Sequence, residues 1–276
     1  MNIADLEDLD KDEASVRVRM NTDITEISSS AYGTFILTNQ GRVWKYGQQK
    51  LVPLCVPQRI IKITCSSTIC LMVDYYGFPW TYECAGREGL VPHIIQGLPR
   101  IQDVACTSDG QAHFLTRTGE LWCRIEAQLV KFDFVFPSPI CKLVSGGFCT
   151  FVLCEDNSIF AKGQSSNGQI PNIQSKILSS FTKISTKTNN GEMVRVIDIS
   201  CGLHHSLFLS ESGKVYSCGS NEYGQLGYER GFSAFSTLNE VTELPEIQQI
   251  ACQRNHSLCL DTKGHLWVFG GRSRNS

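Results

Sequence analysis

The side chains that most often carry chemistry in enzymes are present in this chain, but their spacing matches none of the common catalytic or metal-binding motifs. Thirteen cysteines occur, none in a C-x-x-C pair, and the Cys/His spacing of a tetrahedral zinc site is missing. The segment Ser180–Lys183 fits the S-x-x-K pattern of a serine nucleophile, but its companion motifs are absent. The chain has no G-x-x-x-x-G-K-[ST], H-E-x-x-H or G-x-S-x-G motif. We therefore predict no catalytic residue, no cofactor and no metal site.

An aromatic residue recurs three positions after a turn residue, and this repeat determines the expected architecture. The turn residue is glycine in five units and Asn157 in the sixth. The aromatic residues are Trp44, Trp80, Trp122, Phe160, Tyr216 and Trp267. Twelve or thirteen positions before each turn lies a small side chain: Ser28, Cys65, Cys106, Ser145, Cys201 and Cys252. A unit of about 36–56 residues written six times indicates a repeat fold.

Four of the thirteen cysteines occupy this small-residue position, where serine replaces them in the other two units. A side chain that is interchangeable with serine at a strand end is a packing residue. We expect buried free thiols in a reducing compartment, with some disulfides as the alternative.

Each unit reads as three or four short strands. Segments such as Val196–Ser200 alternate apolar and polar residues, as half-buried strands do, and the turn glycine supplies a positive φ where the chain reverses. The sequence predicts an all-β fold, a β-propeller of about six four-stranded antiparallel blades with the aromatic residues packed between blades. Ser15–Met20 also alternates, and we expect it to pair with Leu266–Phe269 as the fourth strand that closes the ring.

Composition narrows the setting of this propeller, which we place at residues 15–271, between an acidic segment 1–14 and a tail 272–276. A net charge of −2 favours neither nucleic acid nor anionic membranes as partners. No run of about 18 apolar residues predicts a membrane span, and the acidic N-terminus does not resemble a secretory signal. We expect a monomeric, cytoplasmic protein.

The fifth unit, residues 196–227, resembles the repeat of the regulator of chromosome condensation family. The matching landmarks are Cys201-Gly202, His205-Ser206, Gly213, Tyr216, Gly219 and the run Asn221–Gly227. The sixth and fourth units match less fully, and the first three keep mainly the strand pattern. The resemblance implies a propeller like that of the exchange factors for the small GTPase Ran, whose founding members have seven blades. The acidic N-terminus differs from the basic tail of chromatin-bound members, so we do not expect chromatin binding. The chain is also similar to short, divergent members delivered into host cells as virulence effectors by intracellular bacteria, which would place it in the host cytosol.

The longest gap between anchors contains additional polar residues, which we interpret as an insertion at about 164–195. Within it, Ser185–Glu192 has an Asn-Asn-Gly turn typical of a hairpin. In the exchange-factor family, a hairpin wedge projects from one blade into the nucleotide site of the GTPase. The resemblance therefore makes Lys187, Asn189, Asn190 and Glu192 candidate GTPase contacts. The alternative is a flexible solvent loop.

A second group of candidate contacts lies in loops of the fifth and sixth units. His205 and His256 precede serine at one repeat position, and we expect them to be structural histidines bonded to the backbone of the neighbouring blade. His204 is off this register and is the better surface candidate. The remaining candidates are Asn221, Glu222, Tyr223 and Arg254, because tyrosine and arginine are favoured at interfaces.

Three functions remain open at this point. The first is guanine-nucleotide exchange on Ran or a related small GTPase without covalent chemistry. The second is a non-catalytic propeller that binds proteins as a scaffold or inhibitor. The third, a hydrolase or lyase in a central channel, has no motif to support it.

Overall fold

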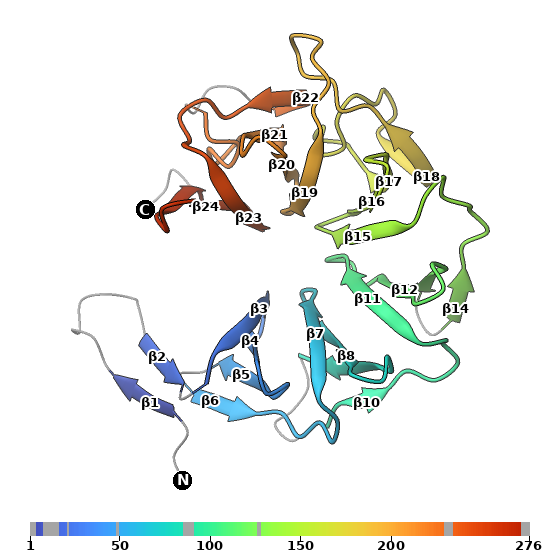
Figure 1. Cartoon of the computed structure of the whole chain (residues 1–276), viewed down its shortest axis with the longest axis vertical. Coiled ribbons are helices and arrows are strands. Elements are labelled where there is room, and N and C mark those ends of the chain that lie inside the picture. The colour runs from blue at the N-terminus through green and yellow to red at the C-terminus, as the bar shows by residue number, and fades with distance from the viewer. Residues whose placement is uncertain are drawn as a thin grey trace. The chain divides into compact units, whose positions relative to one another are not determined.

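The computed structural model describes residues 4–7, 17–20, 22–47, 50–84, 91–125, 128–228 and 234–271. None of these residues is helical, and 25 strands account for the regular structure (Figure 1). The chain divides into two compact units, residues 1–104 and 105–276. The predicted all-β fold class is therefore confirmed. The predicted tail 272–276 and most of the acidic segment 1–14 lie outside the described residues.

The first unit contains a two-stranded sheet and two four-stranded antiparallel sheets. The small sheet pairs β1 (Ala4–Glu7) with β2 (Arg17–Met20). The next sheet is β3 (Ile24–Ser30), β4 (Gly33–Thr38), β5 (Val43–Gly47) and β6 (Lys50–Pro53). The third is β7 (Ile60–Cys65), β8 (Ile69–Asp74), β9 (Pro79–Glu83) and β10 (His93–Ile94).

The boundary between the units falls within β11 (Ile101–Cys106), whose sheet continues with β12 (Ala112–Thr116), β13 (Leu121–Ile125) and β14 (Gln128–Lys131). The following sheet is β15 (Ile140–Ser145), β16 (Cys149–Cys154), β17 (Ile159–Gln164) and β18 (Ile177–Ile184).

Two more sheets complete the second unit. One is β19 (Val196–Cys201), β20 (His205–Ser210), β21 (Val215–Ser220) and β22 (Ala234–Glu240). The last is β23 (Ile247–Gln253), β24 (His256–Asp261) and β25 (Leu266–Gly270). Six sheets thus repeat one antiparallel strand order, as the six units of the sequence predict, and we call each sheet a blade.

The turn between the second and third strand of every blade has the conformation that its sequence predicts. The five turn glycines have φ between 74° and 87°, and Asn157 has φ of 63°. Asparagine is one of the few residues besides glycine that tolerates this left-handed region. The substitution of Asn157 for glycine in the fourth blade therefore preserves the turn.

The recurring aromatic residues pack into the blades, with one exception. Trp44, Trp80, Phe160 and Tyr216 are buried, and Trp122 is half-buried. Phe160 packs with Phe134, Phe136 and Phe181. Trp267 departs from the prediction, because 40% of its surface is exposed. Its neighbours on β25, Leu266 and Val268, are exposed as well.

The N-terminal strand pairs differently from our prediction. Its described part, β2, pairs with β1, and among the described residues the blade of β25 has three strands. Ser15 and Val16 lie outside the described residues. The reason for the error is that alternation identifies a half-buried strand but contains no information about its partner.

The segment expected as an insertion at 164–195 is partly blade. Its centre forms β18, the fourth strand, which pairs with β17 through a register shift between Ala161 and Gly163. The material beyond the blade is the connection from β18 to β19, residues 185–195.

All thirteen cysteines lie within the described residues, and none of them forms a disulfide bond. Most are buried, including Cys201, and the exposed ones are Cys55 and Cys141. Burial raises the pKa of the Cys259 thiol to about 12 and raises that of Cys218 well above its ordinary value. These thiols are packing groups with little thiolate character.

Candidate interaction surfaces

The predicted contact residues divide between opposite ends of the strands in the second unit. Strands β19 and β20 run antiparallel, so that Val196 lies opposite Ser210 at one end and Cys201 opposite Ser206 at the other. Lys187, Asn189, Asn190 and Glu192 belong to the connection that enters β19 at its first end, which we call the hairpin edge. The turns that contain His204, Arg254 and residues 221–223 lie at the second end, which we call the histidine edge. The two groups of candidate contacts therefore do not form one compact site at a single end of the strands.

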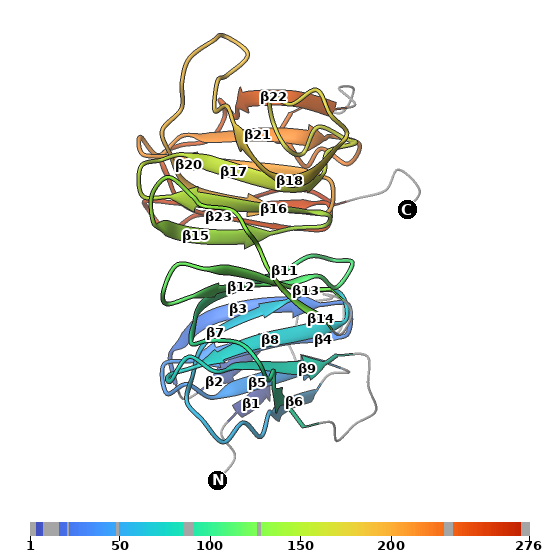
Figure 2. The same cartoon turned by 90° about the vertical axis from the view of Figure 1, so that its right-hand side faces the viewer.

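Residues 187–193 form a tight hairpin, as the Asn-Asn-Gly sequence predicts. Lys187 bridges Met193, and the Thr188 amide donates to the Glu192 carbonyl at 2.8 Å. Gly191 has φ of 86°, and its amide donates to the Thr188 carbonyl at 3.0 Å. The hairpin extends away from the blades at the hairpin edge (gold in Figure 2).

The base of this hairpin is fixed to the neighbouring blade. Thr188 is buried and forms a parallel bridge with Leu238 of β22, and the Asn189 amide donates to the Leu238 carbonyl at 3.2 Å. The Asn172 amide group donates to the carbonyls of Ser185 and Lys187 at 2.9 and 2.8 Å. The hairpin is thus a held projection rather than a loop without internal contacts.

The tip of the hairpin is polar and accessible. Lys187, Asn189, Asn190 and Glu192 are all exposed, and Met193 is 65% exposed. A cavity of about 500 Å³ lies beside the hairpin and is lined by residues including Asp156, Lys183, Thr186, Met193 and Arg195. Hydrogen bonds from the Ser158 side chain and amide lower the pKa of Asp156, so this carboxylate is ionised at neutral pH. The hairpin edge therefore presents both signs of charge.

At the histidine edge, backbone hydrogen bonds link three turns. The Leu203 amide donates to the Arg254 carbonyl at 2.8 Å, and the Ser220 amide donates to the His204 carbonyl at 2.8 Å. Arg254 is exposed with φ of 44°, and Glu222 is exposed on the third turn. His204 is only half-buried and stacks on Phe148 at 5.8 Å. These contacts bring His204, Glu222 and Arg254 to one end of two blades.

Asn221 and Tyr223 have different positions in their turn. Asn221 is 1% exposed, and its side-chain oxygen accepts from the Leu226 amide at 3.0 Å. The Tyr223 amide donates to the Gln225 side chain at 2.8 Å, while the Tyr223 residue is half-buried. The same turn occurs one blade earlier, where the Asn167 amide donates to the Gln169 side chain at 3.1 Å. Asn221 therefore stabilises the turn and offers little surface to a partner.

His205 is buried, as expected for a structural histidine, but its partner is a side chain. Its Nε2 lies 2.8 Å from Ser257 Oγ, and the Ser257 hydroxyl donates to the Gln225 carbonyl at 2.7 Å. Since that hydroxyl proton is committed, Nε2 of His205 is the donor. Burial lowers the pKa of His205 to about 4, so the ring is neutral at pH 7. A Cβ on Gly202 would lie 2.2 Å from His205 Cε1, which explains the glycine after Cys201.

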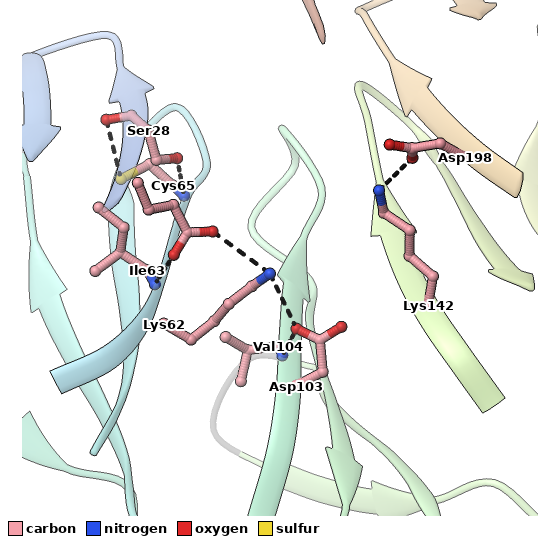
Figure 3. A network of polar contacts seen from close by, with 9 residues as sticks. Ser28, Lys62, Ile63, Cys65, Asp103, Val104, Lys142 and Asp198 are labelled. Carbon is pink, nitrogen blue, oxygen red and sulfur yellow. Dashed lines mark hydrogen bonds and ion pairs between the residues drawn. The ribbon is translucent and has the colours of Figure 1, made fainter. Parts of the chain in front are cut away.

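A charged network on the first strands of the blades escaped our sequence analysis. In the first unit, Lys62 Nζ lies 3.4 Å from a carboxylate oxygen of Glu26 and 3.5 Å from one of Asp103 (Figure 3). In the second unit, Lys142 pairs with Asp198. Burial opposes the charged form of Lys62, but Asp103 and Glu26 outweigh it and raise its pKa.

These charges share one repeat position, and a signal for them was present in the sequence. The third residue of each first strand is, in chain order, Glu26, Lys62, Asp103, Lys142, Asp198 and Gln249. In the first, second, fourth, fifth and sixth blades, the pairing between first and second strands shows a register shift immediately before this residue. Aligning the units on their first strands, instead of on the aromatic residue, would have shown the alternation of sign.

Family models identify the fifth and sixth units. Two models, both described as regulator of chromosome condensation (RCC1) repeat, match residues 196–225 and 212–260. These matches contain the turns and histidines of the histidine edge.

Whole-chain comparisons extend the similarity. Human regulator of chromosome condensation is 24% identical over 285 residues, covering 92% of this chain and 61% of that protein. The probable human E3 ubiquitin-protein ligase HERC6 is 33% identical over 126 residues, covering 45% of this chain and 12% of that protein. The chain therefore spans less than two thirds of the length of these relatives.

Among solved structures, Prp20p from Saccharomyces cerevisiae superposes with a TM-score of 0.78 at 16% identity. The alignment covers 95% of this chain and 77% of that one. This similarity shows the fold, and the chain is a six-bladed β-propeller protein. Its fifth and sixth units match the RCC1 repeat, and its similarity to human regulator of chromosome condensation extends over 92% of the chain.

The part of the chain that the structure describes contains no helix long and apolar enough to cross a bilayer. The same residues contain no group of three or more His, Cys, Asp or Glu side chains placed to hold a metal ion.

Proposed function

We propose that this chain is a guanine-nucleotide exchange factor for a small GTPase, Ran or a relative, and that the hairpin 187–193 acts at the nucleotide site of the GTPase. Two similarities support the proposal. The relationship to human regulator of chromosome condensation covers 92% of the chain. The structure of Prp20p, which has the same fold, was reported with the binding of Prp20p to Gsp1p and histones.

The observation that carries the proposal is the construction of the hairpin. An exchange factor must stabilise the nucleotide-free partner more than the nucleotide-bound one, which requires differential contacts. A segment ordered before binding loses less entropy when it inserts. Here Thr188 and Asn172 hold the base, while Asn189, Asn190 and Glu192 stay exposed. The hairpin thus combines an ordered base with an accessible polar tip.

Charge at the tip suits contact with a nucleotide-binding loop. Glu192 offers a carboxylate to the cationic side chains that surround phosphates, and Lys187 offers a cation to acidic Mg²⁺ ligands. Asn189 and Asn190 supply amide groups that both donate and accept hydrogen bonds. Displacing a nucleotide in this way requires no covalent bond to any of these residues.

Release of fluorescent GDP from a panel of small GTPases, Ran included, tests the proposal. We expect catalytic amounts of the chain to accelerate release from at least one member. The triple variant Asn189→Ala, Asn190→Ala, Glu192→Ala should reduce that acceleration at least tenfold. It retains Thr188 and Gly191, so the hairpin keeps its base and turn. A matched control, Thr262→Ala with Lys263→Ala, changes another exposed turn at the hairpin edge and should leave exchange unchanged.

Each remaining result has one interpretation. If no GTPase responds, the exchange proposal is wrong. If exchange occurs but the triple variant retains full activity, the chain is an exchange factor that does not use the hairpin.

The second candidate is a non-catalytic protein-binding propeller. It is favoured by the connected turns of the histidine edge, where exposed Glu222 and Arg254 lie at one end of two blades. Tight binding to a GTPase without accelerated release would support this function over exchange.

A further inference from the structure

One turn of the first unit departs from the polar pattern of its repeat. The turns between second and third strands are polar in five blades, with sequences such as Arg117-Thr-Gly-Glu120 and Thr262-Lys-Gly-His265. In the second blade, the turn reads Tyr75-Tyr-Gly-Phe78. Tyr75 is 60% exposed, Tyr76 is 56% exposed and Phe78 is 37% exposed. We call residues 75–78 the aromatic turn.

A buried carboxylate fixes the backbone of the aromatic turn. Asp74 is fully buried and accepts hydrogen bonds from the amides of Tyr76 and Phe78 at 3.0 and 2.9 Å. Its second oxygen accepts from the Trp80 indole at 3.0 Å. The exposed rings are therefore displayed from a rigid turn, so little backbone entropy is lost on binding.

The sixth blade contains the same arrangement with different side chains. Asp261 accepts from the amides of Lys263 and His265 at 2.9 and 2.8 Å, and from the Trp267 indole at 3.2 Å. Thr262, Lys263 and His265 thus occupy the positions of Tyr75, Tyr76 and Phe78. The carboxylate alone does not require aromatic residues, so the fold does not explain why three of them are exposed in the second blade.

The surroundings of the aromatic turn are basic. Arg100 Cζ lies 3.6 Å above the centre of the Phe78 ring, and the Arg59 carbonyl accepts the Tyr75 amide at 2.8 Å. The turns and connections at this end of the unit are residues 39–42, 54–59, 74–78 and 95–100. Their exposed charged side chains are Arg42, Arg59 and Arg100. The nearby acidic residue Asp23 is exposed and accepts from Asn39 at 3.0 Å.

We propose that the aromatic turn binds an acidic segment of a partner protein that also carries apolar side chains. The rings of Tyr75, Tyr76 and Phe78 offer apolar surface, and the two tyrosines also carry hydroxyl groups that can donate hydrogen bonds. Tyrosine and arginine are enriched at the energetic centres of protein interfaces. Three exposed arginines against one exposed carboxylate select carboxylates on the partner. This surface is separate from the hairpin of the proposed exchange function, and the inference does not rest on that function.

A protein segment fits this surface better than single-stranded nucleic acid does. Aromatic and arginine side chains also stack on bases, but nucleic-acid affinity depends mainly on neutralising many phosphates. The chain has a net charge of −2, and the exposed cations beside the turn are three arginines. If binding of an oligothymidylate probe depended on the aromatic turn, the partner would be a single-stranded nucleic acid instead.

Replacing the aromatic turn by the corresponding turn of the sixth blade provides the test. The variant Tyr75→Thr, Tyr76→Lys, Phe78→His, which we call the turn-swap variant, gives the second blade the residues that the chain itself places around Asp261, so the fold should be retained. The unchanged chain is used to select from a displayed library of random peptides of about 12 residues. We expect enrichment of acidic peptides that contain aromatic or aliphatic residues. The affinity for these peptides should fall at least tenfold in the turn-swap variant and in the double variant Arg59→Glu, Arg100→Glu. Binding of the peptides to the unchanged chain should weaken as the salt concentration rises.

The matched control is Thr262→Ser with Lys263→Gln on the corresponding turn of the sixth blade, which should bind the peptides unchanged. The proposal is overturned if no peptides are enriched, if the enriched peptides are basic, or if the turn-swap variant binds them equally. It is also overturned if no acidic peptide is enriched and the turn-swap variant loses binding to oligothymidylate. GDP release by the turn-swap variant should equal that of the unchanged chain, so this inference can fail without the nucleotide-exchange proposal failing.

Discussion

His205 and Ser257 form a buried hydrogen bond that joins two adjacent blades. The imidazole Nε2 on β20 donates to the Ser257 hydroxyl on β24 at 2.8 Å, and that hydroxyl donates a hydrogen bond to the Gln225 carbonyl at 2.7 Å. These two hydrogen bonds connect a strand of the fifth blade, through Ser257 of the sixth blade, to the turn that follows β21. Because both side chains are fully buried, water cannot replace either partner.

Removing this imidazole should destabilise the second unit. We expect His205→Ala to lower the free energy of unfolding by about 2–4 kcal/mol, since it creates a cavity and removes a buried donor. His256→Ala is the matched control, because His256 follows the same repeat register but is exposed. Urea unfolding of both variants measures the difference. A double-mutant cycle with Ser257→Ala should give a coupling of about 1 kcal/mol. Equal effects of the two histidine variants would contradict the structural role of His205.

The buried histidines should also make stability depend on pH. Burial lowers the pKa of His205 to about 4 and that of His113 to about 3, against 6.5 for an ordinary histidine. Between those values the unfolded chain binds protons that the folded chain does not, so stability falls as pH falls below 6.5. Each histidine contributes a slope of roughly 1 kcal/mol per pH unit. Urea unfolding at pH 7.5, 6.5 and 5.5 should show the decrease, and a flat profile would show that the rings become charged without unfolding.

Much of the fold could be predicted from the sequence because its signals are local. A left-handed turn residue, such as Gly213, and an apolar aromatic residue three positions later, such as Tyr216, fix a hairpin and its buried face. The hairpin 187–193 was predictable for the same reason, since Asn-Asn-Gly selects the turn without reference to the rest of the molecule.

The features that could not be predicted depend on pairing between distant segments. Alternation marked the N-terminal strand but could not show that β2 pairs with β1. The burial of Asn221 follows from its bond to the Leu226 amide, whereas its sequence position beside Glu222 suggested an exposed loop. The Lys62 network was missed because its three members are about 40 residues apart and each forms an unremarkable strand residue alone.

Reversing the charge of Lys62 should expose the value of this network. Lys62→Glu places three carboxylates together, and we expect the free energy of unfolding to fall by about 1–2 kcal/mol. Lys62→Met should cost less, because partly exposed ion pairs contribute only about 0.2–1 kcal/mol each. The triple variant Glu26→Lys, Lys62→Glu, Asp103→Lys restores opposite charges and should recover most of the loss. Thermal unfolding at low and high salt checks the order, and salt should reduce the penalty of Lys62→Glu. If the triple variant does not recover stability, the dominant contribution is the hydrogen bond from the Ile63 amide to the Glu26 carboxylate, at 2.8 Å, and not the charge.

The carboxylate beneath the aromatic turn offers a sharper stability test. Asp74→Ala leaves two amides and the Trp80 indole without their acceptor, and we expect a loss of about 2–4 kcal/mol. Asp74→Asn should lose less, because the remaining oxygen can still accept from the two amides while the new amide group faces the indole donor. Indole fluorescence during urea unfolding reports both changes. Similar stabilities of the alanine and asparagine variants would mean that the turn holds its shape without the carboxylate.

The contribution of Asp261, the corresponding carboxylate of the sixth blade, to the free energy of unfolding should be lost at acidic pH. Burial tends to raise the pKa of Asp261, but hydrogen bonds from His265, Trp267 and the Lys263 amide outweigh it and lower the pKa to about 2. An unfolded aspartate has a pKa of 3.8, so the stabilising contribution is complete above about pH 4 and is lost as pH falls toward 2. The stability difference between the unchanged chain and Asp261→Asn should therefore be constant from pH 7 to 5 and shrink between pH 4 and 2. A difference that persists at pH 2 would show that the hydrogen-bond geometry, and not the ionised carboxylate, stabilises this turn.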